Sequence, residues 1–282
     1  MGALSGRIPR WISLRIPGGA DYVRVKGVIE REKLHTVCMA ARCPNVGDCF
    51  CAGTATFLIM GDVCTRNCRY CAIRSGAPGP ADPTEPERVA RAIAELGLRY
   101  AVITSVTRDD IPDGGAALFA ATVRAIRGIS PHCRVEVLIP DFGQSMETSI
   151  ERVMEAGPDV INHNIETVGS LFPSLRPRGD YSLSLRLLAR VASSGRPAKS
   201  GLMLGLGESM DQVRATLEDL LRAGCSILTA GQYLRSRREN HPVERFYTPE
   251  EFERVRELAE SMGFGRVLAG PMVRSSYHAG EL

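Results

Sequence analysis

The chain has 282 residues, of which 44% are hydrophobic and 24% charged, and its formal net charge is +3. This composition is typical of a folded globular protein, and so small a charge gives no reason to expect a nucleic-acid partner. We also expect no membrane span, because no apolar run approaches the ~20 residues that a transmembrane helix needs.

The first 20 residues carry Arg7, Arg10 and Arg15 and no acidic residue, which is a feature of transit peptides. Proline at positions 9 and 17 and glycine at positions 18 and 19 would interrupt an amphipathic helix in this stretch. We therefore predict an irregular arm at this end of the chain.

Six apolar runs with the length of buried strands follow, and amphipathic patterns with a helical period separate them. The predicted strands are Phe57–Met60, Tyr100–Val106, Arg134–Ile139, Val160–Ile165, Lys199–Leu204 and Ile227–Tyr233. The predicted helices are Glu87–Leu96, Gly115–Ile126, Met146–Glu155, Ser182–Val191, Met210–Arg222 and Pro249–Met262. Thr248 and Glu251 are placed to form a capping box on the last helix. Helix-ending glycines are predicted at Gly157, Gly195, Gly224 and Gly263.

This alternation predicts a parallel α/β sheet whose strands are buried on both faces. Six units are fewer than the eight that close a TIM barrel, so we predict an incomplete (β/α)6 TIM-type barrel. We assign residues 1–52 to an N-terminal extension, 53–264 to the barrel and 265–282 to a C-terminal segment. Because active sites of such folds lie beyond the carboxyl ends of the strands, we expect the polar residues of 107–110 and 162–166 to share one face with Glu208.

Six of the nine cysteines form two triplets, with the spacings C-x4-C-x5-C and C-x3-C-x2-C. These are Cys38, Cys43 and Cys49, followed by Cys64, Cys68 and Cys71. Iron–sulfur clusters are ordinarily held by four ligands, so three cysteines in one loop suggest a cluster with one iron left open for chemistry. Structural zinc and disulfides remain as alternatives, although zinc sites usually pair two C-x2-C knuckles and a chain of this length can bury a core without disulfides. So many thiolates favour a reducing compartment such as the cytosol.

The other three cysteines lie outside these triplets. Cys133 and Cys225 lie beside apolar runs, so we predict buried and unreactive thiols. Cys51 follows the first triplet closely and is either an additional ligand or a spare thiol that oxidises easily. His163 lies within an apolar run and is predicted to be a core histidine whose hydrogen bonds are satisfied.

The loop CTRNCRYC at 64–71 resembles the cluster-binding loop of radical S-adenosylmethionine enzymes, and further segments resemble the lipoyl synthase family. The specific features are the spacing of the first triplet and the sequence Arg-Ser-Ser-Tyr at 274–277. The resemblance extends from about Trp11 to Ala279, over segments 34–49, 53–68, 104–116, 162–168, 199–208, 228–234 and 273–279. The chain departs from the family at Phe50, where a tryptophan is usual, and within 140–145 and 171–181.

The resemblance implies a 4Fe–4S cluster held by Cys64, Cys68 and Cys71, with S-adenosylmethionine chelating its open iron. One electron passed through this cluster would cleave the sulfonium into methionine and a 5′-deoxyadenosyl radical. The family further implies contacts to S-adenosylmethionine from six residues. These are Tyr70, Ser105, Thr107, Glu166, Arg178 and Glu208. Ser105 and Thr107 could instead be polar residues at a strand end, Glu166 and Arg178 could form structural hydrogen bonds, and the segment that ends at Glu208 could simply be a buried strand.

The resemblance also implies a second 4Fe–4S cluster held by Cys38, Cys43, Cys49 and a serine of the Arg-Ser-Ser-Tyr sequence. We favour Ser276 as this ligand and keep Ser275 as the alternative. A hard oxygen among soft thiolates should be the weakest ligand, which suits a cluster that is consumed as the sulfur donor.

The implied enzyme is a sulfurtransferase of lipoate biosynthesis and protein lipoylation, located in the cytoplasm. Its substrate would be an octanoyl chain on a lysine of a lipoyl carrier domain, in 2-oxoacid dehydrogenase acyltransferase subunits or the glycine-cleavage carrier protein. Sulfur would enter at carbons 6 and 8 at the cost of two S-adenosylmethionine molecules. These carbons have no acidic proton, so a radical step suits them. Further implied partners are a reducing ferredoxin or flavodoxin and a cluster-assembly or carrier protein.

Two polar runs have both a functional and a structural interpretation. Arg235, Arg237 and Arg238 could meet an acidic carrier domain or form a solvated loop. The run that holds Asp109, Asp110 and Asp113 could be a solvated loop whose carboxylates cap a helix. For the chain as a whole, rival functions are another radical S-adenosylmethionine enzyme, such as a methylthiotransferase, and a zinc-binding interaction module.

Overall fold

An eight-stranded sheet forms the centre of the fold, in the order β1-β2-β5-β6-β7-β8-β9-β10. The strands from β2 to β10 pair in parallel, whereas β1 pairs with β2 antiparallel. The strands are β1 (His35–Thr36), β2 (Thr56–Ile59), β5 (Tyr100–Ser105), β6 (Arg134–Leu138), β7 (Val160–Asn162), β8 (Ala198–Leu204), β9 (Ile227–Gln232) and β10 (Arg266–Gly270). The computed structural model of the chain describes residues 8–12, 18–41, 43–51, 55–277 and 279–281.

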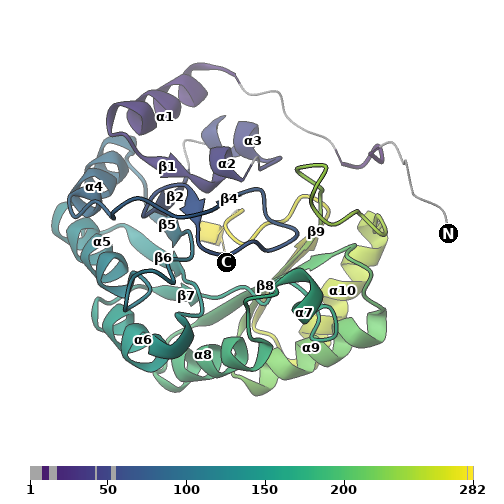
Figure 1. Cartoon of the computed structure of the whole chain (residues 1–282). Coiled ribbons are helices and arrows are strands. Elements are labelled where there is room, and N and C mark those ends of the chain that lie inside the picture. Colours follow the sequence, from purple (N-terminus) through teal and green to yellow (C-terminus); the bar gives the residue numbers. More distant parts are fainter. Residues whose placement is uncertain (1–7, 13–17, 42, 52–54, 278, 282) are drawn as a thin grey trace.

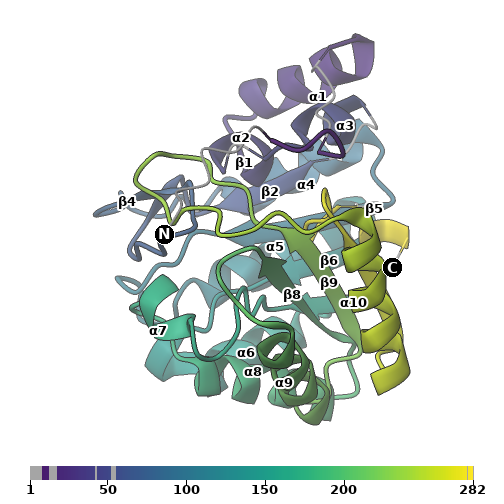
Figure 2. The ribbon, with the colours of Figure 1, turned by 90° about the vertical axis from the view of Figure 1, so that its right-hand side faces the viewer.

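Six helices follow the parallel strands and form the outer layer around the sheet (Figure 1). They are α4 (Glu85–Leu96), α5 (Ala116–Ile129), α6 (Met146–Glu155), α8 (Tyr181–Ser193), α9 (Met210–Arg222) and α10 (Pro249–Met262). The N-terminal helices α1 (Ala20–Arg31), α2 (Val37–Ala40) and α3 (Val46–Cys51) lie together beside β1 and β2 (Figure 2). The described sheet begins at β1 and ends at β10 without closing on itself, so the prediction of an incomplete barrel is confirmed.

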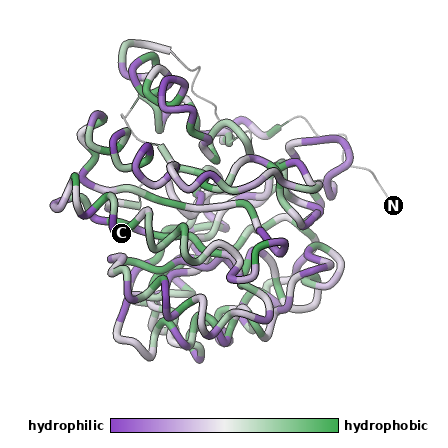
Figure 3. The backbone as a smooth tube through the Cα atoms, turned by 60° about the vertical axis from the view of Figure 1, so that its left-hand side comes forward, coloured by the Kyte–Doolittle hydropathy of each residue, from purple (hydrophilic) through white to green (hydrophobic). Residues whose placement is uncertain are grey.

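The six predicted strands and six predicted helices are present, with ends that differ by a few residues. The helix signals are confirmed in detail at α10, where Thr248 and Glu251 form the capping box and Gly263 ends the helix at φ 112°. Hydrophobic and hydrophilic stretches alternate along the outer helices (Figure 3), as expected when one side of each helix packs on the sheet. None of the described helices is long and apolar enough to cross a membrane.

Several elements outside the six predicted strands and six predicted helices were not predicted, among them α1 and β10. Helix α1 buries Val25, Val28 and Ile29, but Gly27 in its middle lowers its intrinsic helix propensity. Strand β10 is five residues long and pairs only with β9 in the described sheet, so it is an edge strand. Because it is only half-buried, its sequence has a weak apolar pattern. It lies within the predicted C-terminal segment and extends the barrel sheet. Arg7, Arg15 and the predicted boundary between residues 52 and 53 lie outside the described residues.

A buried ion pair joins neighbouring strands inside the barrel. Lys199 Nζ lies 2.9 Å from Glu136 Oε1, and both side chains are about 1% exposed. Tyr100 donates its hydroxyl proton to Glu136 at 2.7 Å, and Asn162 donates to the same carboxylate at 3.0 Å. These bonds link β5, β6, β7 and β8, and they supply the partners that a buried charge requires.

The predicted core residues are also found inside. The His163 side chain is buried, with Nδ1 2.8 Å from the carbonyl oxygen of Ile139, and burial lowers the pKa of its imidazole to about 4. Cys133 and Cys225 are buried as expected. The prediction is wrong in one respect, because Nε2 of His163 has no hydrogen-bond partner among the described residues.

Candidate active site

The second cysteine triplet lies in a loop at the carboxyl ends of the barrel strands. Cys64 ends the short strand β3 (Val63–Cys64), which pairs with β4 (Arg74–Ser75). The amide of Thr65 donates to the carbonyl of Thr107, beyond β5, at 3.0 Å. The amide of Arg69 donates to the carbonyl of Leu175, which ends the short helix α7 (Phe172–Leu175), at 2.9 Å. Backbone hydrogen bonds to two segments on the carboxyl side of the sheet therefore hold the loop.

Arg66, between the first two cysteines of this loop, is clamped by two carboxylates. Its Nη1 and Nη2 donate to Asp141 at 2.6 and 2.7 Å, and its Nε and Nη2 donate to Asp109 at 3.0 and 2.8 Å. The Arg66 side chain is 7% exposed and that of Asp141 is 1% exposed. Burial would raise the pKa of Asp141, but the hydrogen bonds and charge of Arg66 lower it below its usual value. The clamp fixes the loop to the ends of β5 and β6.

The triplet's thiols lie in a buried setting and influence one another. Burial raises the pKa of Cys68, and it raises the pKa of Cys71 to about 12, with Cys64 and Cys68 adding to the rise at Cys71. Burial also raises the pKa of Tyr70 well above its usual value. The thiols are not joined in disulfides. Three neighbouring soft donors in one half-buried loop suit an iron–sulfur cluster, whose bound thiolates release their protons on binding.

In the described part of the chain, no three Cys, His, Asp or Glu side chains converge on a point that could hold one metal ion. Thiolates that hold a 4Fe–4S cluster bind separate irons, so they must be neighbours without converging on a single point. The arrangement of both triplets is compatible with that requirement.

A buried arginine that the sequence analysis missed lies next to the loop. Arg176 is 8% exposed and interacts electrostatically with Cys68, Tyr70 and Glu166. Its Nη1 donates to the carbonyl of Asn164 at 3.1 Å, and its Nε is buried without a hydrogen-bond partner among the described residues. An orphaned buried donor of this kind is costly in an empty site, so it points to a polar ligand. The only sequence signal for a role of Arg176 is its position two residues before Arg178, which was predicted to contact S-adenosylmethionine.

Glu166 faces this arginine from a strained backbone position. Its φ is 70°, a left-handed conformation that costs energy for a residue with a side chain. Its amide donates to the carbonyl of Gly201 at 2.9 Å, and its carbonyl accepts from Met203 at 2.9 Å, so β8 holds it in place. Burial raises the pKa of its carboxyl against the lowering effect of Arg176. Strain held by neighbouring structure is a feature of functional sites.

The other predicted contacts to S-adenosylmethionine have mixed surroundings. Ser105 Oγ is buried without a hydrogen-bond partner among the described residues, which leaves it available to a ligand. Thr107 accepts the amide proton of Thr65 at its carbonyl. Arg178 is 57% exposed and donates to the carbonyl of Thr65 at 2.8 Å. Both carboxylate oxygens of Glu208 accept amide protons, from Gly205 and Leu206, so this side chain holds the turn after β8.

The first triplet lies on the opposite side of β2, in the N-terminal extension. Cys38 is on α2 and Cys49 on α3, and the amide of Cys43 donates to the carbonyl of Cys38 at 3.1 Å. The Cys49 thiol donates a hydrogen bond to Cys38, which lowers the pKa of Cys38 to about 7 and raises that of Cys49. Burial and the charge of Cys38 raise the pKa of Cys43. The three thiols are therefore electrostatic neighbours.

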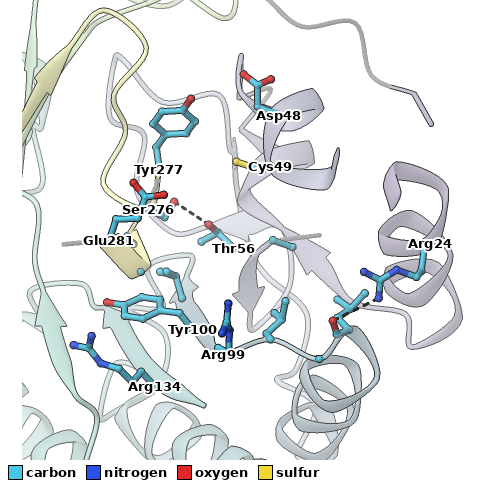
Figure 4. Close-up of a pocket in the computed structure, with 17 residues that line it drawn as sticks. Arg24, Asp48, Cys49, Thr56, Arg99, Tyr100, Arg134, Ser276, Tyr277 and Glu281 are labelled. Atoms are coloured by element: carbon cyan, nitrogen blue, oxygen red, sulfur yellow. Dashed lines mark hydrogen bonds between the residues drawn. The ribbon is translucent and has the colours of Figure 1, made fainter. Parts of the chain in front are cut away.

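The two serines of the Arg-Ser-Ser-Tyr sequence point to different places. Ser276 Oγ accepts a hydrogen bond from Thr56 Oγ1 at 2.8 Å and lines the same pocket as Cys49 (Figure 4). Thr56 in turn lies within hydrogen-bonding reach of Cys38. Ser275 Oγ instead donates to Asn164 Oδ1, beyond β7, at 2.8 Å. Ser276 is thus the serine beside the first triplet.

Two glycines let this C-terminal segment approach the barrel closely. A Cβ at Gly231 would lie 2.0 Å from the carbonyl oxygen of Val273, and one at Gly201 would lie 2.7 Å from Ser275 Oγ. Asn45, before α3, donates to the carbonyl of Met272 at 2.7 Å. The segment is therefore held between the inner strands and the N-terminal extension.

The acidic run after β5 is only partly a set of helix caps. Asp113 accepts from the amide of Ala117 in α5 at 2.9 Å, as predicted for a capping carboxylate. Asp109 and Asp110 instead form ion pairs with Arg66 and Arg108, so the capping interpretation is wrong for them. Buried guanidinium groups need a carboxylate partner more strongly than a helix end does.

The basic loop after β9 packs against the second cysteine loop. Asn240 Nδ2 donates to the carbonyls of Arg69 and Cys71 at 3.1 and 2.9 Å. Arg235 and Arg238 are exposed, whereas Arg237 is half-buried. The thiol of Cys51 donates to the carbonyl of Gly18 at 3.0 Å.

Comparison with known proteins gives a consistent result. The family model for the Radical SAM superfamily matches residues 58–220, and that for the N-terminal domain of lipoyl synthase matches residues 3–43. The lipoyl synthase of Thioalkalivibrio sulfidiphilus is 51% identical over 98% of this chain and 87% of its own length. That of Methylococcus capsulatus is 52% identical over 98% of this chain and 86% of its own length.

Solved structures support the fold. Streptococcus suis SuiB bound to S-adenosylmethionine matches with a TM-score of 0.60 at 11% identity, covering 80% of this chain and 54% of that chain. At such low identity the similarity concerns the fold alone.

The Arg66 clamp predicts a specific sensitivity of the second cysteine loop. We expect Arg66→Lys to lower the rate of reductive S-adenosylmethionine cleavage at least tenfold, because a lysine cannot pair with both carboxylates in the same planar geometry. Each charge-assisted hydrogen bond contributes about 1.5–3 kcal/mol, and about 1.4 kcal/mol corresponds to a factor of ten. Release of 5′-deoxyadenosine by reconstituted protein measures the rate.

Arg256→Lys is the matched control, because Arg256 forms ion pairs with Glu253 and Glu260 on the surface of α10. This control should behave as the parent protein does, since exposed ion pairs contribute about 0–1 kcal/mol. Cleavage by Arg66→Lys at the parent rate would show that the clamp does not position the loop.

The close approach at Gly231 predicts a separate effect on the first triplet. We expect Gly231→Ala to displace the segment that carries Ser276, and iron after anaerobic reconstitution to fall from about eight to about four per chain. Gly128→Ala is the control, because its Cβ would meet nothing within 4 Å. Full iron content in Gly231→Ala would contradict this dependence on the C-terminal segment.

Proposed function

The chain belongs to the lipoyl synthase family of radical S-adenosylmethionine enzymes, and from that membership we propose how its own residues divide the reaction. The family's enzymes are sulfurtransferases that use S-adenosylmethionine and two 4Fe–4S clusters. They insert sulfur at carbons 6 and 8 of an octanoyl chain carried on a protein lysine. The proposed substrate of this chain is therefore an octanoylated lipoyl carrier domain.

One observation carries the assignment of two cooperating sites. Arg274, which is half-buried and precedes the two serines, interacts electrostatically with Cys43 of the first triplet and with Glu166. Glu166 in turn interacts with Cys68 of the second triplet. The two thiol sets thus lie on either side of one short polar segment, as required if a radical formed at one site is to be captured by sulfur from the other.

The two triplets have different proposed roles. Cys64, Cys68 and Cys71 would hold the cluster that binds S-adenosylmethionine, and the first triplet with Ser276 would hold the second. When bound, the cluster of Cys64, Cys68 and Cys71 would supply the electron that cleaves S-adenosylmethionine into methionine and a 5′-deoxyadenosyl radical. The cluster of the first triplet would supply the sulfur. The thiolate and oxygen chemistry of the proposed ligands supports this division, since the serine oxygen is the hardest donor in the set.

The surrounding residues position the reactants and exclude water. Arg176 and Glu166 provide buried opposite charges beside the second loop, where a ligand with an ammonium and a carboxylate group would find a partner for each. Ser105 offers a further buried hydroxyl. Tyr70 and the thiols around it are half-buried, which limits access of water to a carbon radical.

The carrier domain would meet the rim of this site. Arg235 and Arg238 are exposed on the loop that packs against the second cysteine loop through Asn240. Exposed guanidinium groups at the entrance favour an acidic carrier surface and speed its approach. Ferredoxin or flavodoxin is the proposed reductant, a cluster-assembly or carrier protein the proposed source of new clusters, and a reducing cytosol the proposed location.

Mass spectrometry of an octanoylated carrier peptide tests the proposed reaction. After one turnover of fully reconstituted protein, and oxidation of the two new thiols to the disulfide in air before measurement, we expect the peptide mass to increase by two sulfurs minus two hydrogens. The unmodified octanoyl peptide incubated without S-adenosylmethionine is the control. Abundant 5′-deoxyadenosine with no sulfur in the peptide would contradict the assigned substrate.

Substitution of the two serines tests the ligand assignment. We expect Ser276→Cys to leave formation of 5′-deoxyadenosine within about twofold of the parent while sulfur transfer falls at least tenfold, because a soft thiolate holds its iron more tightly. Ser275→Ala should retain sulfur transfer, since its hydroxyl contacts Asn164. If Ser275→Ala loses sulfur transfer and Ser276→Cys retains it, Ser275 is the ligand.

A further inference from the structure

Three arginines lie on the solvent side of the second cysteine loop, and we call them the loop-face arginines. They are Arg69, Arg74 and Arg178, and all three are exposed. The loop and strand β4 lie at the carboxyl end of the barrel, with β4 at the left-hand edge of Figure 2. Exposed positive charges at this end of the barrel attract a partner with an acidic surface.

Arg69 occupies a tight turn that joins two of the proposed cluster ligands. The amide of Cys71 donates to the carbonyl of Cys68 at 3.0 Å and closes this turn. Tyr70 packs inward against the small apolar cluster that contains Leu175. The Arg69 side chain is instead exposed and forms no hydrogen bond or ion pair with the residues that the structure describes. The turn thus presents an unpaired guanidinium to solvent directly after Cys68.

The backbone of Arg69 is held firmly on both sides of the residue. Its amide donates to the carbonyl of Leu175 at 2.9 Å. Its carbonyl accepts from the amide of His241 at 2.8 Å and from Asn240 Nδ2 at 3.1 Å. A guanidinium on a fixed backbone loses less freedom on binding than one on a mobile loop, so this position suits a docking surface.

The other two loop-face arginines are attached to the same loop. Arg74 lies on β4, which pairs with the strand that ends at Cys64. Its side chain is 66% exposed and lies 3.6 Å from that of Asp62. Such an exposed ion pair contributes about 0–1 kcal/mol, so the carboxylate of a partner can replace it. Arg178 is 57% exposed and donates to the carbonyl of Thr65 at 2.8 Å.

An electron donor has to come closer to this loop than any other partner of the proposed reaction. Electron transfer between proteins slows steeply as the separation of the two redox groups grows, so the donor must contact the segment that carries the ligands. The carrier domain has a different requirement, because its octanoyl chain has to reach the space between the two triplets. Complexes for electron transfer bury little surface and depend on electrostatic steering, which a few exposed charges provide.

We propose that the loop-face arginines form the docking surface of the electron donor, a small acidic protein that carries a one-electron redox group. This inference rests on the proposed function, in which ferredoxin or flavodoxin is the reductant. One electron leaves the docked donor and is consumed when the carbon–sulfur bond of S-adenosylmethionine breaks into methionine and a 5′-deoxyadenosyl radical, so the step balances without a further reactant. The carrier domain meets Arg235 and Arg238 on the neighbouring loop.

Charge reversal of Arg69 and Arg74 tests this docking surface. Reconstituted protein with S-adenosylmethionine is mixed anaerobically with flavodoxin hydroquinone, and stopped-flow absorbance follows oxidation of the flavodoxin to its semiquinone. At about 10 mM ionic strength we expect Arg69→Glu/Arg74→Glu to lower the second-order rate constant about tenfold, because the acidic donor is repelled. At about 1 M, where charges are screened beyond ~3 Å, the difference should disappear. Arg178 is left unchanged, because it was predicted to contact S-adenosylmethionine.

An uncharged small reductant separates docking from damage to the loop. With photoreduced 5-deazariboflavin in place of flavodoxin, the double variant should release 5′-deoxyadenosine within about twofold of the parent rate, because this reductant is not steered by charge. Arg69→Glu alone breaks no ion pair among the described residues. It should lower the flavodoxin rate by a smaller factor, with the same dependence on salt.

Arg186→Glu/Arg214→Glu is the matched control, because both arginines are exposed on α8 and α9, away from the loop. It changes the net charge equally and should react with flavodoxin at the parent rate.

Three results would overturn the proposal: an unchanged flavodoxin rate in the double variant, an equal loss in the control, or a loss that persists at high salt or with deazariboflavin. An unchanged flavodoxin rate together with weaker binding of the octanoylated carrier domain would assign the surface to the carrier instead. A parent protein that releases no 5′-deoxyadenosine with either reductant would overturn the proposed function, so the two failures are distinguishable.

Discussion

The buried guanidinium of Arg66 is the interaction on which the arrangement of the active site depends. A charge that is 7% exposed must be paired, and the chain pairs it with Asp109 after β5 and Asp141 after β6. Because these two strands are adjacent in the sheet, the cysteine loop can occupy only the position where both carboxylates reach it. The order of the strands in the sheet therefore fixes the position of the three thiols.

A second constraint comes from the close approach of backbone to backbone. Gly201 and Gly231 lie on neighbouring inner strands, and the absence of their side chains admits the segment that carries Ser275 and Ser276. The N-terminal extension then closes on this segment through Asn45. Parts of the chain that are more than 200 residues apart are thereby hydrogen-bonded to one another beside the first triplet, an arrangement that the barrel alone could not provide.

The two edges of the sheet have different environments. At the carboxyl edge, the buried Arg176 and the half-buried Glu166 lie next to the loop that would generate a radical. At the amino edge, exposed arginines border a pocket that reaches Cys49 and Ser276. A carbon radical must be protected from water, and the proposed radical site lies at the less exposed of the two edges.

The sequence by itself determined the barrel units, the capping box at Thr248 and both cysteine triplets, because these depend on local periodicity and on short spacings. Only the tertiary structure decided that Asp109 pairs with Arg66, that Arg176 is the buried arginine, and that Ser276 lies beside Cys49. Each of these contacts joins residues far apart along the chain. The burial and pairing of charged residues depend on which strand ends become neighbours, and a local sequence pattern cannot predict which strand ends these are.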